Sequence, residues 1–265
     1  MVLLCLGSVA QAAPVSVYLN HAVATDDPVA RYTCLVQAYP DYLSHVDNNE
    51  LIWKDGTRMI IDHGRRFASH DEWLDNACLR DQLLQCYPSA SLRSPSLNED
   101  PGRARYEPFF LKMYGETKAK VQSNLKTIVW MPGVFDKKLQ VTSVNGVADK
   151  LSAISAELVK LPKALHRYLK NPGGTFNWRN IAGTKRMSTH SFGITIDINV
   201  AESHYWRNAK PDRSGLYAYK NAIPQDIVAI FEKHGFVWGG KWYHYDTMHF
   251  EYRPELLQAP CRCSE

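Results

Sequence analysis

The sequence predicts an α+β fold, in which helices cover an antiparallel sheet. Some segments carry apolar residues at helical spacing, as in 147–158, whereas others alternate with a period of two, as in 194–198. Strand-like and helix-like segments do not follow each other in the regular order of a parallel sheet. The sequence contains no internal repeat and no glycine-rich phosphate-binding loop. These observations favour a mixed fold with an antiparallel sheet.

The composition is that of an ordinary globular protein. The chain has 265 residues, of which 45% are hydrophobic and 22% are charged, and its formal net charge is +4. It contains no run of five or more Lys and Arg residues, so we expect no nucleic-acid partner and at most a mild attraction to an anionic polymer. No segment after the first residues approaches the roughly eighteen apolar residues of a membrane span. We expect a monomer.

The first thirteen residues are uncharged and mostly apolar, and they end in Ala10-Gln11-Ala12, an A-x-A cleavage pattern. We interpret residues 1–13 as the remnant of a signal peptide and predict an exported protein, periplasmic or extracellular. The alternative interpretation is an apolar N-terminal strand.

The cysteines are consistent with export. They are Cys5, Cys34, Cys78, Cys86, Cys261 and Cys263. Signal cleavage would remove the first and leave an odd number. In an exported protein, Cys78 could pair with Cys86, or Cys34 with one of the C-terminal pair, which leaves one thiol over. The spacing is not that of a zinc finger, so we expect structural cysteines.

The remaining elements are predicted from periodicity, turns and caps. We expect helices at 28–39, 71–87, 107–123, 145–162 and 225–234, a hairpin at 51–61 around Asp55-Gly56, and strands at 127–130, 139–142 and 175–179. Arg103 and Arg105 precede the third of these helices. We interpret them first as solvated charges and second as contacts to a wall polymer.

The Ser-, Pro- and Asn-rich segment 88–101 is typical of a linker or long loop. It divides the predicted chain into an N-terminal extension, 14–99, which could pack on the rest, and a catalytic domain, 100–258. A cysteine-containing tail, 259–265, follows.

Two short segments carry the chemistry. Ser188 to Asp197 places His190 and Asp197 seven positions apart, with Gly193 between them where the backbone can turn. Asp246 to Glu251 adds His249, flanked by two carboxylates. Two histidines and one carboxylate suffice for a catalytic zinc, which needs three protein ligands. Either segment alone is a weak signal, but the two together are much more specific.

Strand parity indicates which side chains could meet. If residues 194–198 form a strand, the isoleucines face a core while Asp197 faces a cleft. By the same parity His249 and Glu251 share one face. Asp246 would lie on the opposite face unless the chain turns, so we place it on a turn beside the site.

The pattern S-x-H-x-x-G-x-x-x-D, followed some fifty residues later by D-x-x-H-F-E, resembles the D-alanyl-D-alanine metallopeptidases, the VanY-like zinc peptidases that trim peptidoglycan. The segment Trp238-Gly239-Gly240-Lys241-Trp242 is similar to the same region of the L-alanyl-D-glutamate endopeptidases. The resemblance covers roughly residues 100–256. It implies that the antiparallel sheet carries a zinc site, as in the Hedgehog and D,D-peptidase fold.

The resemblance also implies roles. The zinc ligands would be His190, Asp197 and His249, and Asp246 would be the general base. Arg179 and Arg186 are the candidate cations for the oxyanion, although neither lies in the G-Y-R context of many relatives. Glu251 would orient a histidine. The substrate-binding candidates are Ser188, Trp242 and His244.

We therefore expect a zinc peptidase acting on peptidoglycan stem peptides, most simply a D-alanyl-D-alanine carboxypeptidase. An L-alanyl-D-glutamate endopeptidase is the alternative within the enzymes. A different class, a zinc-stabilised binding domain without turnover, is known on the related Hedgehog scaffold. Asp246 discriminates between these classes, because a pure binding module needs no base.

Overall fold

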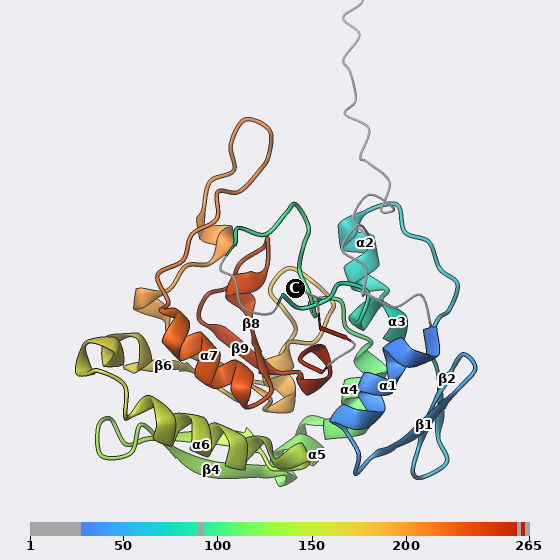
Figure 1. The fold of residues 1–265 in the computed structure, drawn as a ribbon, viewed down its shortest axis with the longest axis horizontal. Coiled ribbons are helices and arrows are strands. Elements are labelled where there is room, and N and C mark those ends of the chain that lie inside the picture. Colours follow the sequence, from blue (N-terminus) through green and yellow to red (C-terminus); the bar gives the residue numbers. More distant parts are fainter. Residues whose placement is uncertain (1–27, 89–92, 259–260, 263–265) are drawn as a thin grey trace, which may run out of the picture.

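The computed structural model describes residues 28–88, 93–258 and 261–262. It confirms the α+β class, with three antiparallel sheets and helices packed against them (Figure 1). The predicted signal segment and Cys5 lie outside the described residues. No helix within the described ranges is both long and apolar enough to cross a membrane.

The N-terminal part combines helices with a small sheet. Helix α1 (Pro28–Ala38) is followed by a sheet of order β1 (Leu43–Asp47), β2 (Glu50–Trp53) and β3 (Arg58–Ile60), and then by helices α2 (His70–Asp75) and α3 (Leu79–Gln82). The predicted first helix and the hairpin around Asp55-Gly56 are confirmed, whereas β1 was not predicted.

The predicted helix at 71–87 is wrong, because the segment forms two short helices. Ser69 caps the start of α2, and Asn76 ends it in a non-helical conformation. Cys78 then adopts an extended conformation and caps α3 together with Asp81. Since each cap satisfies backbone groups at a helix end, the local hydrogen bonds favour a break here.

The middle of the chain forms a helical pair and a hairpin. It contains α4 (Glu107–Tyr114), α5 (Lys118–Ser123), β4 (Leu125–Trp130), β5 (Lys137–Thr142) and α6 (Val147–Leu158). The predicted helix at 107–123 is divided at Gly115, whose φ of +136° ends α4. Thr117 then caps α5 through its side chain. The two predicted strands pair in register, and α6 packs on β4.

The C-terminal part contains the sheet that positions the site. Its four strands have the order β6 (Pro172–Gly174), β7 (Thr195–Asn199), β9 (His249–Tyr252) and β8 (Phe236–Trp238), and α7 (Gln225–Lys233) precedes β8. Short 3-10 helices complete the chain at η2 (Val144–Gly146), η3 (Lys163–Leu169), η4 (Thr189–Phe192), η5 (Val200–Glu202), η6 (Trp206–Asn208), η7 (Gly239–Lys241) and η8 (Pro254–Leu256).

The prediction of a strand at 175–179 is wrong. The segment that pairs with β7 lies earlier in the chain and contains Gly173 and Gly174. A Cβ atom on Gly173 would lie 3.1 Å from Cβ of Asp197 and 3.0 Å from Cγ2 of Val200. Only a glycine allows the backbone to approach β7 so closely. Gly174 has a φ of +124°, at which the strand ends.

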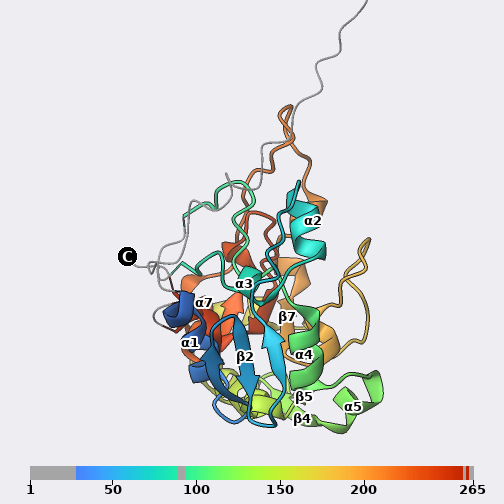
Figure 2. The ribbon, with the colours of Figure 1, turned by 90° about the vertical axis from the view of Figure 1, so that its right-hand side faces the viewer.

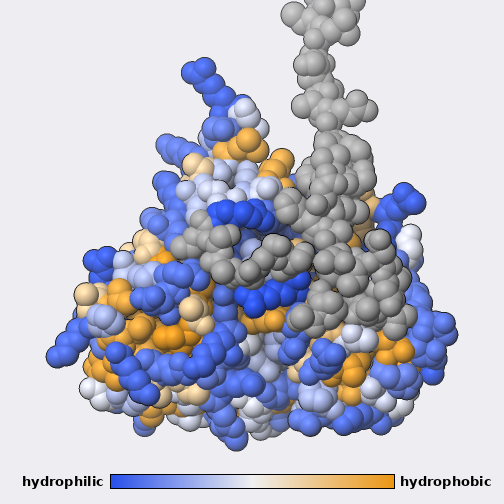
Figure 3. Space-filling model, viewed as in Figure 1, coloured by the Kyte–Doolittle hydropathy of each residue, from blue (hydrophilic) through white to orange (hydrophobic). Residues whose placement is uncertain are grey.

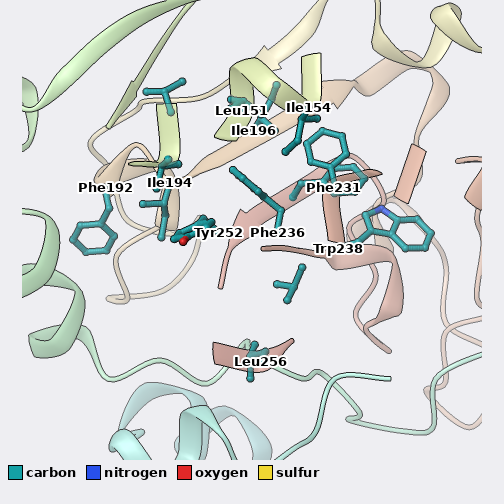
Figure 4. Close-up of a cluster of buried hydrophobic side chains, with 14 of the residues drawn as sticks. Leu151, Ile154, Phe192, Ile194, Ile196, Phe231, Phe236, Trp238, Tyr252 and Leu256 are labelled. Atoms are coloured by element: carbon teal, nitrogen blue, oxygen red, sulfur yellow. The ribbon is translucent and has the colours of Figure 1, made fainter. Parts of the chain in front are cut away.

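The core lies between this sheet and helices α6 and α7 (Figure 4). The isoleucines predicted to face it, at 194, 196 and 198, are fully buried. Phe231 of α7 stacks on Phe250 of β9 with ring centroids 3.9 Å apart. Helices therefore cover one face of the sheet and leave the face of Asp197 for the site.

One continuous cluster of buried side chains joins the N-terminal elements to the C-terminal sheet. The β1–β2–β3 sheet and α4 lie side by side in Figure 2, and Trp53 contacts Phe109 with ring centroids 5.5 Å apart. Tyr39 donates a hydrogen bond of 2.7 Å to Glu255. The face seen in Figure 3 is largely hydrophilic, with smaller hydrophobic areas between. The domain division itself stays a prediction.

A disulfide joins Cys34 of α1 to Cys261 near the C-terminus, one of the pairings left open by the sequence. Cys86 is also disulfide-bonded, while Cys78 is a buried free thiol that donates to Asp81. The pairing of Cys78 with Cys86, the other possibility left open by the sequence, is therefore wrong. Disulfides of this kind persist in oxidising compartments.

Candidate metal centre

The sheet register places Asp197 and His249 side by side. They are cross-strand partners on β7 and β9, and the facing side chains of such partners lie close together. Oδ1 of Asp197 is 3.1 Å from Nδ1 of His249. Pairing of two strands far apart in sequence thus assembles two of the three predicted ligands.

His190 enters from the η4 turn that precedes β7. Ser188 caps this turn, accepting a hydrogen bond from the backbone N–H of His190. Gly193 ends the turn with a φ of +68°, and a Cβ there would lie 2.9 Å from Leu125. This glycine lets the chain turn sharply, and Nε2 of His190 comes to 3.2 Å from Oδ2 of Asp197.

The outer ring nitrogen of each histidine faces an acceptor. Nδ1 of His190 is 2.7 Å from the carbonyl oxygen of Thr175, and Nε2 of His249 is 3.1 Å from Oε2 of Glu251. Because both partners only accept, each of these nitrogens carries the proton in a neutral imidazole. The inner nitrogens can then offer their lone pairs to a metal ion that Asp197 also ligates.

The donor set fits a zinc ion. The ligand atoms of His190, Asp197 and His249 all lie within 4.8 Å of one another. Two ligands about 2.0–2.1 Å from a tetrahedral zinc are about 3.3 Å apart. The two nitrogen–oxygen distances here are 3.2 Å and 3.1 Å. Two imidazoles and one carboxylate, which leave a fourth position, are typical of a catalytic zinc site.

Glu251 supports this cluster from a fully buried position. It accepts hydrogen bonds from Arg105, Arg253 and Thr189 in addition to its contact with His249. Burial alone would raise the pKa of Glu251, but Arg105, His249 and Arg253 hold it well below its usual range. Glu251 is therefore an anion that can orient His249.

Asp246 lies where the chain turns into β9, as the sequence predicts. It forms a bridge with Tyr205, and its carbonyl oxygen accepts from the N–H of His249 at 3.1 Å. Its Oδ1 atom is buried and has no hydrogen-bond partner among the described residues. Burial, together with the nearby charge of Asp197, raises the pKa of Asp246 to about 6.

All four of these groups line one cavity of about 520 Å³, which we call the metal cavity. They are His190, Asp197, Asp246 and His249. Of the other predicted site residues, Arg179, Ser188 and Trp242 also line it. Arg179 is exposed, whereas Trp242 is buried and packs on the ring of His249, with centroids 5.6 Å apart.

Arg186 and His244 are not among the residues that line the metal cavity. Arg186 lines a neighbouring cavity, with Nε 2.9 Å from Oδ1 of Asp75. His244 belongs to a second cluster with His70 and the fully buried Asp100. Nδ1 of His244 is 2.6 Å from Oδ2 of Asp100, a length typical of a charge-assisted hydrogen bond. It is shorter than the distance of about 3.3 Å between two ligand atoms of a tetrahedral zinc.

Arg103 and Arg105 line the metal cavity, although the sequence favoured solvated charges. That first interpretation is wrong for Arg105, whose side chain is 13% exposed and bonds Glu251 at 2.6 Å. Arg103 lies over the ring of Trp242, 5.3 Å from its centroid, and donates to the carbonyl of His244. The sequence indicates only that Arg103 and Arg105 are two positions apart, a spacing that places two side chains on the same side of an extended segment.

The comparisons with known proteins address the same part of the chain. Residues 182–252 match the family model of the D-alanyl-D-alanine carboxypeptidases. This part of the chain is therefore similar to that family. Neither the curated proteins nor the solved structures gave a significant match.

The matched residues include every member of the candidate centre, namely His190, Asp197, Asp246 and His249. Arg103 and Arg105 lie outside the matched residues. The structure thus adds two cavity residues that the match does not cover. The match over 182–252 is to the family that the sequence pattern resembles.

Proposed function

We propose that the protein is a zinc-dependent peptidase that hydrolyses peptidoglycan stem peptides, acting as a D-alanyl-D-alanine carboxypeptidase. One observation carries this proposal. In the metal cavity, a carboxylate with an unpaired oxygen, Asp246, lies beside a cluster of zinc-type ligands. The match to the carboxypeptidase family supports the choice of substrate class.

The ligands would be His190, Asp197 and His249. A zinc ion held there supplies a water of lowered pKa and polarises the scissile carbonyl. Thr175 and Glu251 hold the two imidazoles in the orientation that ligation requires.

Asp246 would act as the general base. Its free oxygen can accept the proton of the attacking water, and the same group can return that proton to the leaving amine. A carboxylate with a pKa near 6 both accepts and releases a proton readily at neutral pH. A non-catalytic binding domain would gain nothing from a buried carboxylate at this position.

The cavity also offers groups for the substrate. Arg179 lies at its exposed edge, where its guanidinium could bind the oxyanion or a carboxylate. Ser188 and Trp242 line the wall next to the two histidines. We propose these three as substrate contacts, and Arg103 as a further cation.

The disulfide between Cys34 and Cys261 agrees with a protein that acts outside the cytoplasm. We propose an exported enzyme, periplasmic or extracellular, whose substrate is the wall polymer.

Digestion of purified peptidoglycan, with mass analysis of the products, tests the proposal. The predicted product is the release of a terminal D-alanine from pentapeptide stems. Cleavage between L-alanine and D-glutamate would change the assignment to an endopeptidase. Absence of any new fragment with zinc-loaded protein would contradict the proposal.

A further inference from the structure

A second cavity adjoins the metal cavity and is lined by an excess of cations. It measures about 250 Å³. Its charged lining residues include Arg65, Arg103, Arg105, Arg186, Asp75 and Glu107. We call it the arginine cavity. Four guanidinium groups here face two carboxylates.

The two carboxylates do not neutralise this charge. Glu107 accepts the backbone N–H of Met187 at 3.0 Å. The side chain of Asp75 is 52% exposed, and its Oδ1 lies 2.9 Å from Nε of Arg186 without the alignment of a hydrogen bond. Because Asp75 is exposed, water screens much of its charge, and it offsets the charge of Arg186 only in part.

Of the four, Arg186 alone has buried side-chain nitrogens without a hydrogen-bond partner among the described residues. Its side chain is 17% exposed, and its buried Nη1 atom has no hydrogen-bond partner among the described residues. Burial, with the positive charges of Arg103 and Arg105, lowers the pKa of Arg186 to about 10. A buried donor left without a partner is costly, so an acceptor is expected to fill this position.

Arg103 and Arg105 form a wall common to both cavities. On one side they face the candidate zinc ligands, and on the other they face Arg186. Arg105 is bound to Glu251 and Arg103 to the carbonyl of His244, so both guanidinium groups are held in place. Because the two cavities share these residues, an anionic group of a molecule bound at the metal cavity could lie between their guanidinium groups and that of Arg186.

We propose that the arginine cavity is an anion-binding subsite that receives a carboxylate of the peptide substrate. Guanidinium groups match carboxylates through paired N–H donors, and a cavity of this size admits one small acidic group. The link to a substrate rests on the proposed peptidase function, whereas the anion site itself does not.

The anion site is tested by calorimetric titration of the full chain with sulfate as the probe. We expect one saturable site in the wild type and at least a tenfold loss of affinity in Arg186→Gln, because a charge-assisted hydrogen bond is lost. Asp75→Asn should bind sulfate several-fold more tightly, a gain that misfolding cannot produce. Arg167→Gln, at a surface arginine with a 63% exposed side chain, is the matched control and should bind like the wild type. Equal affinity of the wild type and Arg186→Gln, or no saturable binding, would overturn the site.

The substrate link is tested with stem pentapeptides that carry one amidated carboxylate each. With the wild type, we expect one of the amidated peptides to have a higher KM than the parent peptide. Arg186→Gln should raise the KM of the parent peptide by a similar factor. It should not raise the KM of that amidated peptide any further. If Arg186→Gln binds sulfate weakly but raises KM equally for every peptide, the site takes a free anion, and the substrate link is wrong. If no peptide is hydrolysed at all, the peptidase proposal and the substrate link fail together, and the sulfate titration still decides the anion site.

Discussion

Asp197 and His249 face each other across β7 and β9, with Oδ1 and Nδ1 3.1 Å apart, although 52 residues separate them in the sequence. The pairing of Ile196 with Phe250 in the same ladder buries the opposite face against the core. Because a slip of either strand by one residue would turn its ligand into that core, hydrophobic burial fixes the register on which the metal centre depends.

Loss of any ligand should empty the centre. We expect His190→Ala, Asp197→Ala and His249→Ala each to lose stoichiometric zinc, because each leaves only two protein ligands. Elemental analysis of the purified variants measures this. His45→Ala, at an exposed histidine of β1 whose Nδ1 lies 3.0 Å from Oγ of Ser44, should keep its zinc. Full zinc in all three ligand variants would place the metal elsewhere.

Glu251→Gln should weaken both the fold and the metal centre. It removes the negative charge that the buried Arg105 faces, so we expect the free energy of unfolding to fall by about 3 kcal/mol or more. It also alters the acceptor that orients His249, and such partners typically change metal affinity by about 10- to 100-fold. Urea unfolding and zinc titration measure the two effects. Glu157→Gln removes a surface ion pair with Lys233 and should change stability far less, so equal losses would contradict this account.

The Asp100 cluster should make stability depend on pH. Burial would raise the pKa of Asp100, but hydrogen bonds from His244 and His70 hold it below its usual range. A depressed folded-state pKa contributes stability above the unfolded value, near 4, and this contribution is lost as the pH falls further. Asp100→Asn should therefore lower the free energy of unfolding by about 3–5 kcal/mol at pH 7, and by less below pH 4. A difference that does not change with pH would show that the charge of Asp100 is not responsible.

The Cys34–Cys261 disulfide should stabilise the folded chain by closing a long loop. Its partners are 227 residues apart, so we expect Cys34→Ala to lower the free energy of unfolding by about 2–4 kcal/mol. Cys34→Ala/Cys261→Ala should be no less stable than the single variant. Chemical denaturation under oxidising conditions compares them, and additive losses would mean that the two cysteines do not act as a pair.

The sequence predicted the parts of the centre that depend on local pattern. The parity of residues 194–198 indicated correctly that the isoleucines are buried, and Gly193 marked the turn that brings in His190. The spacing of Asp246 and His249 likewise indicated a turn ahead of β9. These features follow from the period of a strand and from backbone sterics, which short segments contain in full.

The environment of the centre could not be predicted, because it depends on contacts between distant segments. Arg105 resembles a solvated charge until Glu251 is placed beside it. Arg186 lies four residues before His190, yet the fold places it in the arginine cavity. The break at Gly115 and the pairing of Gly173 with β7 also depend on tertiary packing rather than on propensity.

The most direct test of the central claim is the rate of peptide hydrolysis by Asp246→Asn, measured on the same sample as its zinc content. The substitution keeps the size of the side chain but removes its basicity. We predict full zinc and a rate lowered by a factor of about 100 to 10,000, as is typical for loss of a general base. Wild-type activity in the zinc-loaded Asp246→Asn protein would contradict the account, because Asp246 would then not be the base.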